Sequence, residues 1–212
     1  MTPDLRVYLV TGPVGPGRSL TEVVQQAVAG GVTCVQLRDK TADRTGLVER
    51  ARGLLDVLAP HGVPLLIDDD PWAARDAGAN GVHVGPHDVS PSTAREVVGP
   101  GRLVGWSIED VAQLDEGAEL AACDYLTVSP VWSTPSKRDT APALGLDGVR
   151  AIQARASAWL PVIGIGGIDA ANAADVIDAG ATGVAVISAV CSAIDPRAAA
   201  AALLAAVDGA RR

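Results

Sequence analysis

The stretch Pro161–Asp169, PVIGIGGID, decides the fold that we predict. Val162–Ile165 is a short apolar run typical of a buried strand, and it leads directly into Gly166 and Gly167. Adjacent glycines let backbone N–H groups come close to an anion, and a helix capped by Asp169 would add partial positive charge. The stretch therefore predicts a strand, a phosphate-binding turn and a helix, although such a turn alone is also common without a ligand.

The same alternation of apolar strand and helix recurs along the rest of the chain. We predict strands over Arg6–Val10, Val32–Leu37, Pro64–Ile67, Gly81–Val84, Leu103–Gly105, Asp124–Val128, Val162–Ile165 and Gly183–Ile187. We predict helices over Leu20–Ala29 and Asp43–Leu58, a short helix that Asp68–Pro71 opens and that ends at Gly78, and helices over Pro91–Val98 and Glu109–Gly117. Three more helices should run up to Ala156, up to Ala179, and over Asp195–Val207. Because the strands are apolar throughout, both faces of each should be buried, as in a parallel sheet.

Eight such units in 212 residues favour an α/β fold, a compact (β/α)8 TIM barrel that spans residues 1–212 as a single domain. A doubly wound open sheet is the alternative. It fits less well because no GxGxxG motif follows the first strand and because the units are evenly spaced.

The net charge indicates which binding partners the protein is not expected to have, and the cysteines indicate its cellular compartment. The formal net charge is −8, which argues against nucleic-acid and membrane binding, since both call for a basic surface. No signal peptide pattern precedes the first strand, and no apolar run is long enough to span a bilayer. Cys34, Cys123 and Cys191 lie in apolar runs without metal-type spacing, so we expect buried free thiols and a cytoplasmic protein.

Polar residues follow nearly every predicted strand, and these ends are where a barrel carries its chemistry. After the second strand the sequence reads QLRDK, in which Arg38 and Lys40 would point the same way if the strand extends. Two cations on one side can hold a phosphate or a diphosphate, and a solvated, salt-bridged loop is an equal alternative. Ser107 follows the fifth strand, and Ser188 follows the eighth.

Three consecutive carboxylates, Asp68, Asp69 and Asp70, follow the third strand. A helix N-cap explains one of them, but three adjacent carboxylates repel one another, and a hard cation would relieve that repulsion. Asp88 follows the neighbouring strand, and Mg²⁺ prefers one or two carboxylates together with phosphate oxygens. We therefore predict a Mg²⁺ site at this edge.

The long irregular stretch Ser129–Gly145 carries Thr134 and Ser136, followed by Lys137 and Arg138. Connections of this length in a compact domain are usually functional. Hydroxyls beside cations suit a phosphate, and such a loop could close over a charged substrate. An exposed Ser/Pro connector is the alternative.

Taken together, QLRDK, the acidic run, HVGPHD, SPVWSTPSKRDT, GIGGI and GVAVISA resemble the thiamine-phosphate synthase family, in that order and over nearly the whole chain. The combination of QLRDK with the T-x-S-K loop is the specific part. The resemblance implies a (β/α)8 barrel that uses Mg²⁺. It also implies a transferase that joins 4-amino-2-methyl-5-hydroxymethylpyrimidine diphosphate to a thiazole phosphate and releases pyrophosphate.

The resemblance also implies a role for each matching residue. The pyrimidine diphosphate would be bound by Gln36, Arg38, Lys40, Asp68, Ser107 and Lys137. The metal would be bound by Asp69 and Asp88. The thiazole phosphate would be bound by Thr134, Ser136, Gly167, Ile187 and Ser188. Catalysis would rest on Arg38, Lys40, Ser107 and Lys137, without a protein nucleophile or general base.

Two residues depart from the family pattern. Asp68 stands where the family usually has Asn, and an extra carboxylate beside a diphosphate is unfavourable unless it is protonated or meets the metal. Pro86 stands where Gln is common. Both changes leave open a non-catalytic phosphate-binding paralogue.

Four further points stay open. A thiazole tautomerase, a sister family on the same barrel, is the closest alternative. That family carries a catalytic His shortly after the serine of the fifth strand, and this sequence has no His there. A phosphosugar isomerase or epimerase would need an acid–base pair that the strand ends do not offer. His83, within the fourth strand, is as compatible with packing as with chemistry. The sequence is silent on oligomeric state and leaves a homodimer open.

Overall fold

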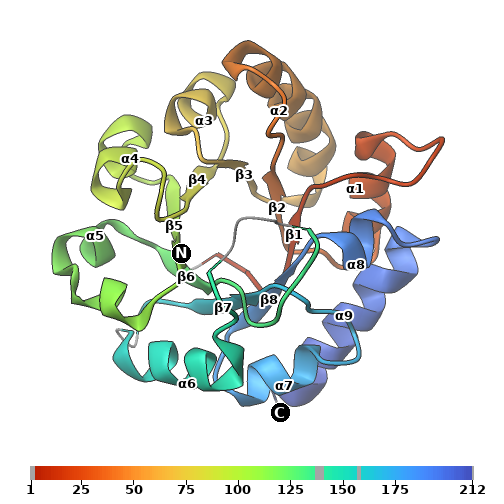
Figure 1. Ribbon diagram of the computed structural model, residues 1–212. Helices are drawn as coiled ribbons and strands as arrows, with labels where there is room; N and C mark the ends of the chain where they lie inside the picture. The colour runs from red at the N-terminus through yellow and green to blue at the C-terminus, as the bar shows by residue number, and fades with distance from the viewer. Residues whose placement is uncertain (1–2, 137–140, 157–158, 212) are drawn as a thin grey trace.

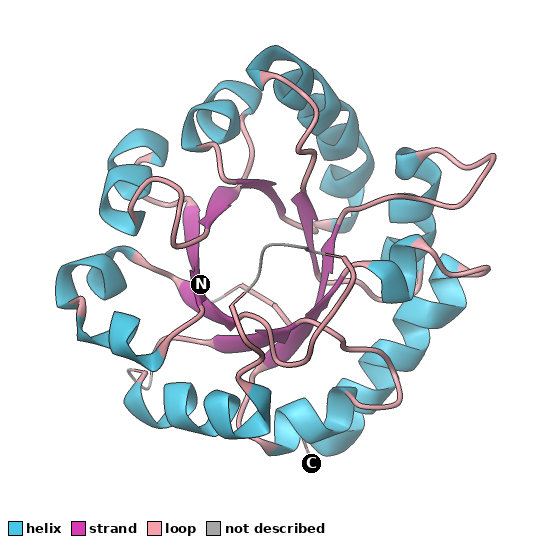
Figure 2. Ribbon diagram, in the orientation of Figure 1, coloured by secondary structure: helices cyan, strands magenta, loops and turns pink. Residues whose placement is uncertain are grey.

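The computed structural model describes residues 3–136, 141–156 and 159–211 and has the predicted barrel. Eight parallel strands form a closed ring in chain order, and the helices lie outside it (Figures 1 and 2). The strands are β1 (Val7–Val10), β2 (Cys34–Leu37), β3 (Leu65–Asp68), β4 (Gly81–Val84), β5 (Leu103–Ile108), β6 (Tyr125–Val128), β7 (Val162–Ile165) and β8 (Gly183–Val186). Pairing of Val7 with Val184 closes the ring, so the barrel has no open strand edge.

The helices follow the strands around the ring. They are α1 (Leu20–Ala29), α2 (Arg44–Leu58), η1 (Ala59–His61), α3 (Pro71–Ala77), α4 (Pro91–Val98), η2 (Val111–Asp115), α5 (Gly117–Ala122), α6 (Gly145–Arg155), α7 (Ala173–Asp178), α8 (Ser188–Cys191) and α9 (Pro196–Ala210), where η marks a 3-10 helix. Polar side chains cap several helix starts, as Ser19 does for α1, Asp43 for α2 and Asp195 for α9. None of the described helices has the length and the apolar character needed to cross a bilayer.

Two predicted boundaries around the fifth strand are wrong. The strand continues to Ile108, so Ser107 lies within β5 and not after it. The helix expected over Glu109–Gly117 is replaced by η2 and α5, because Asp110 caps a 3-10 turn through the N–H of Ala112. The strand therefore ends three residues later than predicted, and the first helical element begins at Val111, two residues later than predicted.

The prediction that Asp169 caps the helix after the seventh strand is also wrong. Asp169 accepts a hydrogen bond from the N–H of Ala171, and Asn172 accepts one from the N–H of Asp169. These bonds hold a turn, and α7 begins only at Ala173. The short helix α8, which begins at Ser188, was not predicted.

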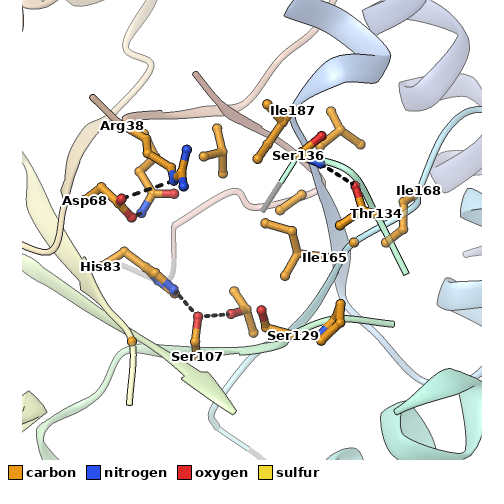
Figure 3. Close-up of a pocket in the computed structure, with 18 of the residues that line it drawn as sticks. Arg38, Asp68, His83, Ser107, Ser129, Thr134, Ser136, Ile165, Ile168 and Ile187 are labelled. Atoms are coloured by element: carbon orange, nitrogen blue, oxygen red, sulfur yellow. Dashed lines mark hydrogen bonds and ion pairs between the residues drawn. The ribbon is translucent and has the colours of Figure 1, made fainter. Parts of the chain in front are cut away.

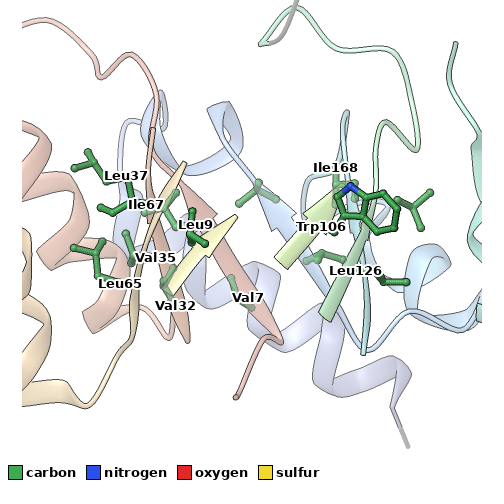
Figure 4. Close-up of a cluster of buried hydrophobic side chains, with 14 of the residues drawn as sticks. Val7, Leu9, Val32, Val35, Leu37, Leu65, Ile67, Trp106, Leu126 and Ile168 are labelled. Atoms are coloured by element: carbon green, nitrogen blue, oxygen red, sulfur yellow. The ribbon is translucent and has the colours of Figure 1, made fainter. Parts of the chain in front are cut away.

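Alternation along each strand divides the core in two. Outward-facing side chains, among them Leu9, Ile67 and Trp106, pack under the helices (Figure 4). Inward-facing side chains fill the barrel interior with Leu5, Tyr8, Val10, Cys34, Leu66, Tyr125, Ile163 and Ala185. The three cysteines are buried free thiols, as predicted.

Candidate active site

A cavity of about 640 Å³ opens at the carboxyl ends of the strands. It is lined by twelve of the predicted site residues, Gln36, Arg38, Lys40, Asp68, Asp69, Asp88, Ser107, Thr134, Ser136, Gly167, Ile187 and Ser188. Figure 3 shows that Arg38 and Asp68 face Thr134 and Ser136 across the cavity. The remaining predicted residue, Lys137, and its neighbour Arg138 lie outside the described residues.

The ends of β2 and β3 form a charged cluster around Asp68. The side-chain amide of Gln36 donates to Asp68 Oδ1 at 3.0 Å. Asp68 Oδ2 lies 3.2 Å from Lys40 Nζ and 3.5 Å from Arg38 Nε. Burial and then the charge of Asp69 raise the pKa of Asp68 to about 6, although both cations act to lower it. The cations therefore face the cavity from one side, partly neutralised by a carboxylate.

The backbone of this cluster is held by Thr11, which was not predicted to belong to the site, and by His83. Thr11 Oγ1 accepts from the N–H of Arg38 at 2.9 Å and lies 3.3 Å from its carbonyl oxygen. The N–H of Asp69 donates to the carbonyl of His83 at 2.8 Å, which ties β3 to β4. The residue that follows β1 thus positions the residue that follows β2.

The three consecutive aspartates divide their roles. Asp70 caps α3 by accepting from the N–H of Ala73 at 2.9 Å, and it pairs with Arg44 at 2.8 Å. Asp69 adopts a left-handed φ of 63°, which turns the chain between β3 and the cap. Only Asp68 and Asp69 therefore line the cavity, and Asp70 belongs to the helix start.

The carboxylates of Asp69 and Asp88 are neighbours across the β3 and β4 ends. Burial raises the pKa of Asp88, a hydrogen bond from Gly85 N–H at 2.7 Å opposes that rise, and the charge of Asp69 adds to it. Lys40 Nζ contacts Asp69 as well. The described residues hold no group of three or more His, Cys, Asp or Glu that would bind a metal by itself. Two mutually repelling carboxylates suit Mg²⁺ with phosphate oxygens as its other ligands.

The inner wall of the cavity carries a chain of buried polar groups from β4, β5 and β6. His83 Nε2 lies 2.9 Å from Ser107 Oγ (Figure 3). Ser107 Oγ in turn lies 3.1 Å from Thr127 Oγ1. His83 Nδ1 lies 2.9 Å from the hydroxyl of Tyr125. Thr127 and Tyr125 were not predicted to belong to the site, although the two-residue period of side chains along β6 could have indicated them.

The opposite wall combines glycines, hydroxyls and apolar side chains. Gly166 and Gly167 have φ values of 105° and 66°, which residues other than glycine rarely adopt. A Cβ on Gly167 would lie 2.9 Å from the Cβ of Trp132, because the loop after β6 packs on this turn. Ser136 Oγ lies 3.5 Å from Ser188 Oγ, at the start of α8. This wall can surround a compact anion with N–H and O–H donors.

Comparison with known proteins identifies the family of the chain. The family model described as thiamine monophosphate synthase matches residues 7–190. The chain is 49% identical over 209 residues to the thiamine-phosphate synthase of Xanthobacter autotrophicus, which covers 98% of each chain. It is 47% identical over 193 residues to that of Albidiferax ferrireducens, which covers 91% of this chain and 87% of the relative.

A solved structure shares the whole fold. The structure of thiamine phosphate pyrophosphorylase from Pyrococcus furiosus superposes with a TM-score of 0.86 at 32% sequence identity. The match covers 99% of this chain and 98% of that one.

Proposed function

We propose a division of labour in the cavity for a chain that belongs to the thiamine monophosphate synthase family. The protein is a transferase of the thiamine-phosphate synthase type, and its substrates are phosphorylated small molecules. In our proposal the charged β2–β3 side binds the pyrimidine diphosphate and the glycine–hydroxyl side binds the thiazole phosphate. The observation that carries this division is the placement of two cations on one wall and of a cradle of glycines and hydroxyls on the other.

Arg38, Lys40 and Gln36 would bind the diphosphate, and Lys137 would add a further cation. Support comes from the cluster around Asp68, which shows that both cations reach one carboxylate oxygen from the same side. An oxyanion of a diphosphate could take the place that Asp68 Oδ2 holds between them. In our proposal Asp68 also lines the diphosphate site, and it must release Arg38 and Lys40 when the diphosphate binds.

Asp69 and Asp88 would hold Mg²⁺, which would supply charge neutralisation for the departing pyrophosphate when it is bound. The neighbouring carboxylates of these two residues support that assignment, because a divalent cation would relieve their repulsion. Gly85 N–H donates to Asp88 Oδ2 at 2.7 Å and so holds this carboxylate at the end of β4.

Thr134, Ser136, Gly167 and Ser188 would bind the thiazole phosphate, with Ile187 as an apolar neighbour of the ring. Placing the phosphate beside the ends of β7 and β8 agrees with the usual position of phosphate sites in these barrels. The closeness of Ser136 and Ser188 supports a shared ligand.

The chemistry needs position and charge more than a protein nucleophile. The carbon that bears the diphosphate is attached to an electron-rich aminopyrimidine and tolerates positive charge. Arg38, Lys40 and Lys137 would stabilise the negative charge that develops on the leaving pyrophosphate. The thiazole nitrogen, held from the opposite wall, would then form the new C–N bond at that carbon.

We also propose that residues 1–212 act as one domain and that the protein works in the cytoplasm. The continuous closed ring supports the first, and the three buried free thiols are compatible with the second.

Turnover by the purified protein tests the proposed function. Thiamine phosphate and pyrophosphate should form in equal amounts when both substrates and Mg²⁺ are present, and should not form after EDTA treatment. Arg38→Ala should slow the reaction, whereas Arg197→Ala, on an exposed part of α9, should not. If intact protein binds the thiazole phosphate in calorimetry but forms no product, the chain is a non-catalytic phosphate-binding barrel.

A further inference from the structure

We propose that Tyr125 and His83 are positioning residues that make Ser107 a hydrogen-bond donor to the substrate. Ser107 would then select a ligand that presents an acceptor there, such as an unprotonated nitrogen of a heteroaromatic ring. This inference rests on the proposed function, because it concerns the pyrimidine side of the same cavity.

Five buried side chains form one continuous chain of hydrogen bonds across the inside of the barrel. The hydroxyls of Tyr8 and Tyr125 are 2.9 Å apart, and the hydroxyl of Tyr125 is 2.9 Å from His83 Nδ1. His83 Nε2 is 2.9 Å from Ser107 Oγ, which is 3.1 Å from Thr127 Oγ1. Each of these side chains is at most 7% exposed.

The two tyrosines at the buried end of this row of hydrogen bonds determine which group donates in each bond. Burial raises the pKa of Tyr8 and of Tyr125 well above the ordinary value, so both phenols keep their protons. Within the described part of the protein, Tyr125 is the one hydrogen-bond partner of the Tyr8 hydroxyl. A buried hydroxyl without an acceptor is costly, so Tyr8 donates to Tyr125. Tyr125 must then donate its own proton to His83 Nδ1.

The tautomer of His83 determines whether Ser107 donates or accepts in the cavity. A neutral imidazole that accepts at Nδ1 carries its proton on Nε2. His83 Nε2–H therefore donates to Ser107 Oγ, and the proton of Ser107 is free to be donated. Thr127 can accept that proton in the free protein, and a ligand in the cavity can accept it in its place.

The rings are held so that this geometry persists. The rings of His83 and Tyr125 stack with centroids 5.5 Å apart and an interplanar angle of 27°. Gly105 makes room for both. A Cβ there would lie 2.1 Å from Tyr125 Cζ and 2.5 Å from His83 Nδ1. A side chain at position 105 would therefore displace the imidazole that orients Ser107.

The position of the imidazole proton can be measured without substrate. In protein labelled with ¹⁵N-histidine, the resonances of His83 are those that disappear in His83→Gln. We expect their ¹⁵N shifts to show a protonated Nε2 and an unprotonated Nδ1. Tyr8→Phe should keep this tautomer, because Tyr125 still has Nδ1 as its acceptor. A proton on Nδ1, or on both nitrogens, would overturn the proposal.

Kinetics of Tyr125→Phe test the consequence for the substrate. We expect KM for the pyrimidine diphosphate to rise about two- to tenfold, the value of one neutral hydrogen bond, with KM for the thiazole phosphate unchanged. In a Ser107→Ala background the same substitution should add nothing. An equal loss without Ser107 would mean that Tyr125 acts only on the fold, and would overturn the proposal.

A double variant separates an effect on the hydrogen bonds from an effect on folding, and the turnover assay tests the proposed function separately. Tyr8→Phe combined with Tyr125→Phe leaves no orphaned phenol, so it should fold and give the same KM change as Tyr125→Phe. If the intact protein makes no thiamine phosphate, the proposed function fails. The tautomer measurement still decides the direction of the hydrogen-bond chain in that case.

Discussion

Asp68 Oδ2 lies 3.2 Å from Lys40 Nζ. This carboxylate is therefore paired with a cation that we assign to binding the diphosphate. The side chain of Asp68 is only 13% exposed and also meets Arg38. A diphosphate and an ionised Asp68 would therefore compete for the same two cations.

Asp68→Asn should lower KM for the pyrimidine diphosphate, because it removes this competition and one like-charge repulsion. We expect about two- to tenfold, the scale of one partly exposed charge pair. The asparagine oxygen can still accept from Gln36, so the local structure should persist. Steady-state kinetics at a pH well above 6, where the carboxylate is ionised, measure the effect. An unchanged or raised KM would show that Asp68 does not compete with the substrate.

Loss of either proposed metal ligand should change the need for Mg²⁺ before it changes anything else. Asp69→Asn and Asp88→Asn should each raise the Mg²⁺ concentration for half-maximal activity by about tenfold or more. Asp56→Asn, at an exposed site on α2, removes the same charge far from the strand ends and should leave the Mg²⁺ dependence unchanged. If all three variants shift alike, the effect is one of net charge and the assignment is wrong.

Gly167→Ala should raise KM for the thiazole phosphate. The φ of 66° strains an alanine, and its Cβ would meet Trp132 at 2.9 Å. Gly78→Ala is the matched control, because its φ of 76° imposes the same kind of backbone strain with no atom within 4 Å of the new Cβ. Both variants should lose some stability. Only Gly167→Ala should change KM, and a KM change in Gly78→Ala would assign the effect to general destabilisation.

The three thiols should be inert in the folded protein. Burial raises the pKa of Cys123 to about 12, and burial also raises the pKa of Cys34 and Cys191. Ellman's reagent should therefore react fully only in denaturant, whereas an added thiol in Ala202→Cys, on the exposed side of α9, should react at once.

The raised pKa values also set a pH dependence of stability. Above the ordinary thiol value of 9.0 the unfolded chain releases protons that the folded chain keeps up to about pH 12 for Cys123. The free energy of unfolding should thus fall as pH rises through this window. Urea titrations of Cys123→Ala should show a weaker fall. An equally steep fall would assign the alkaline loss to other groups.

Much of the barrel could be predicted from the sequence because apolar strands and glycine-ended helices repeat at even spacing. The ends of elements were harder to predict. Ser107 lies inside β5 because pairing with β6 extends that strand, a tertiary effect absent from local pattern. Asp169 sits in a turn because Asn172 accepts its N–H, which competes with a helix start at that point.

The candidate site was predictable where residues stand next to one another along the chain, as in QLRDK or the acidic run. It was not predictable where the partners come from different strands. Nothing local in the sequence shows that Tyr125 reaches His83, or that Thr11 holds the backbone of Arg38. These contacts depend on the barrel register. The roles of the site residues stay predictions until variants are measured.

The most direct test of the two-sided cavity is a comparison of KM for both substrates in Arg38→Ala and Ser188→Ala. We expect Arg38→Ala to raise KM for the pyrimidine diphosphate by about tenfold or more, since it removes a charge-assisted contact, and to leave KM for the thiazole phosphate near the wild-type value. Ser188→Ala should do the reverse. If each variant changes both KM values equally, or if the preferences are exchanged, the assignment of the two walls is wrong.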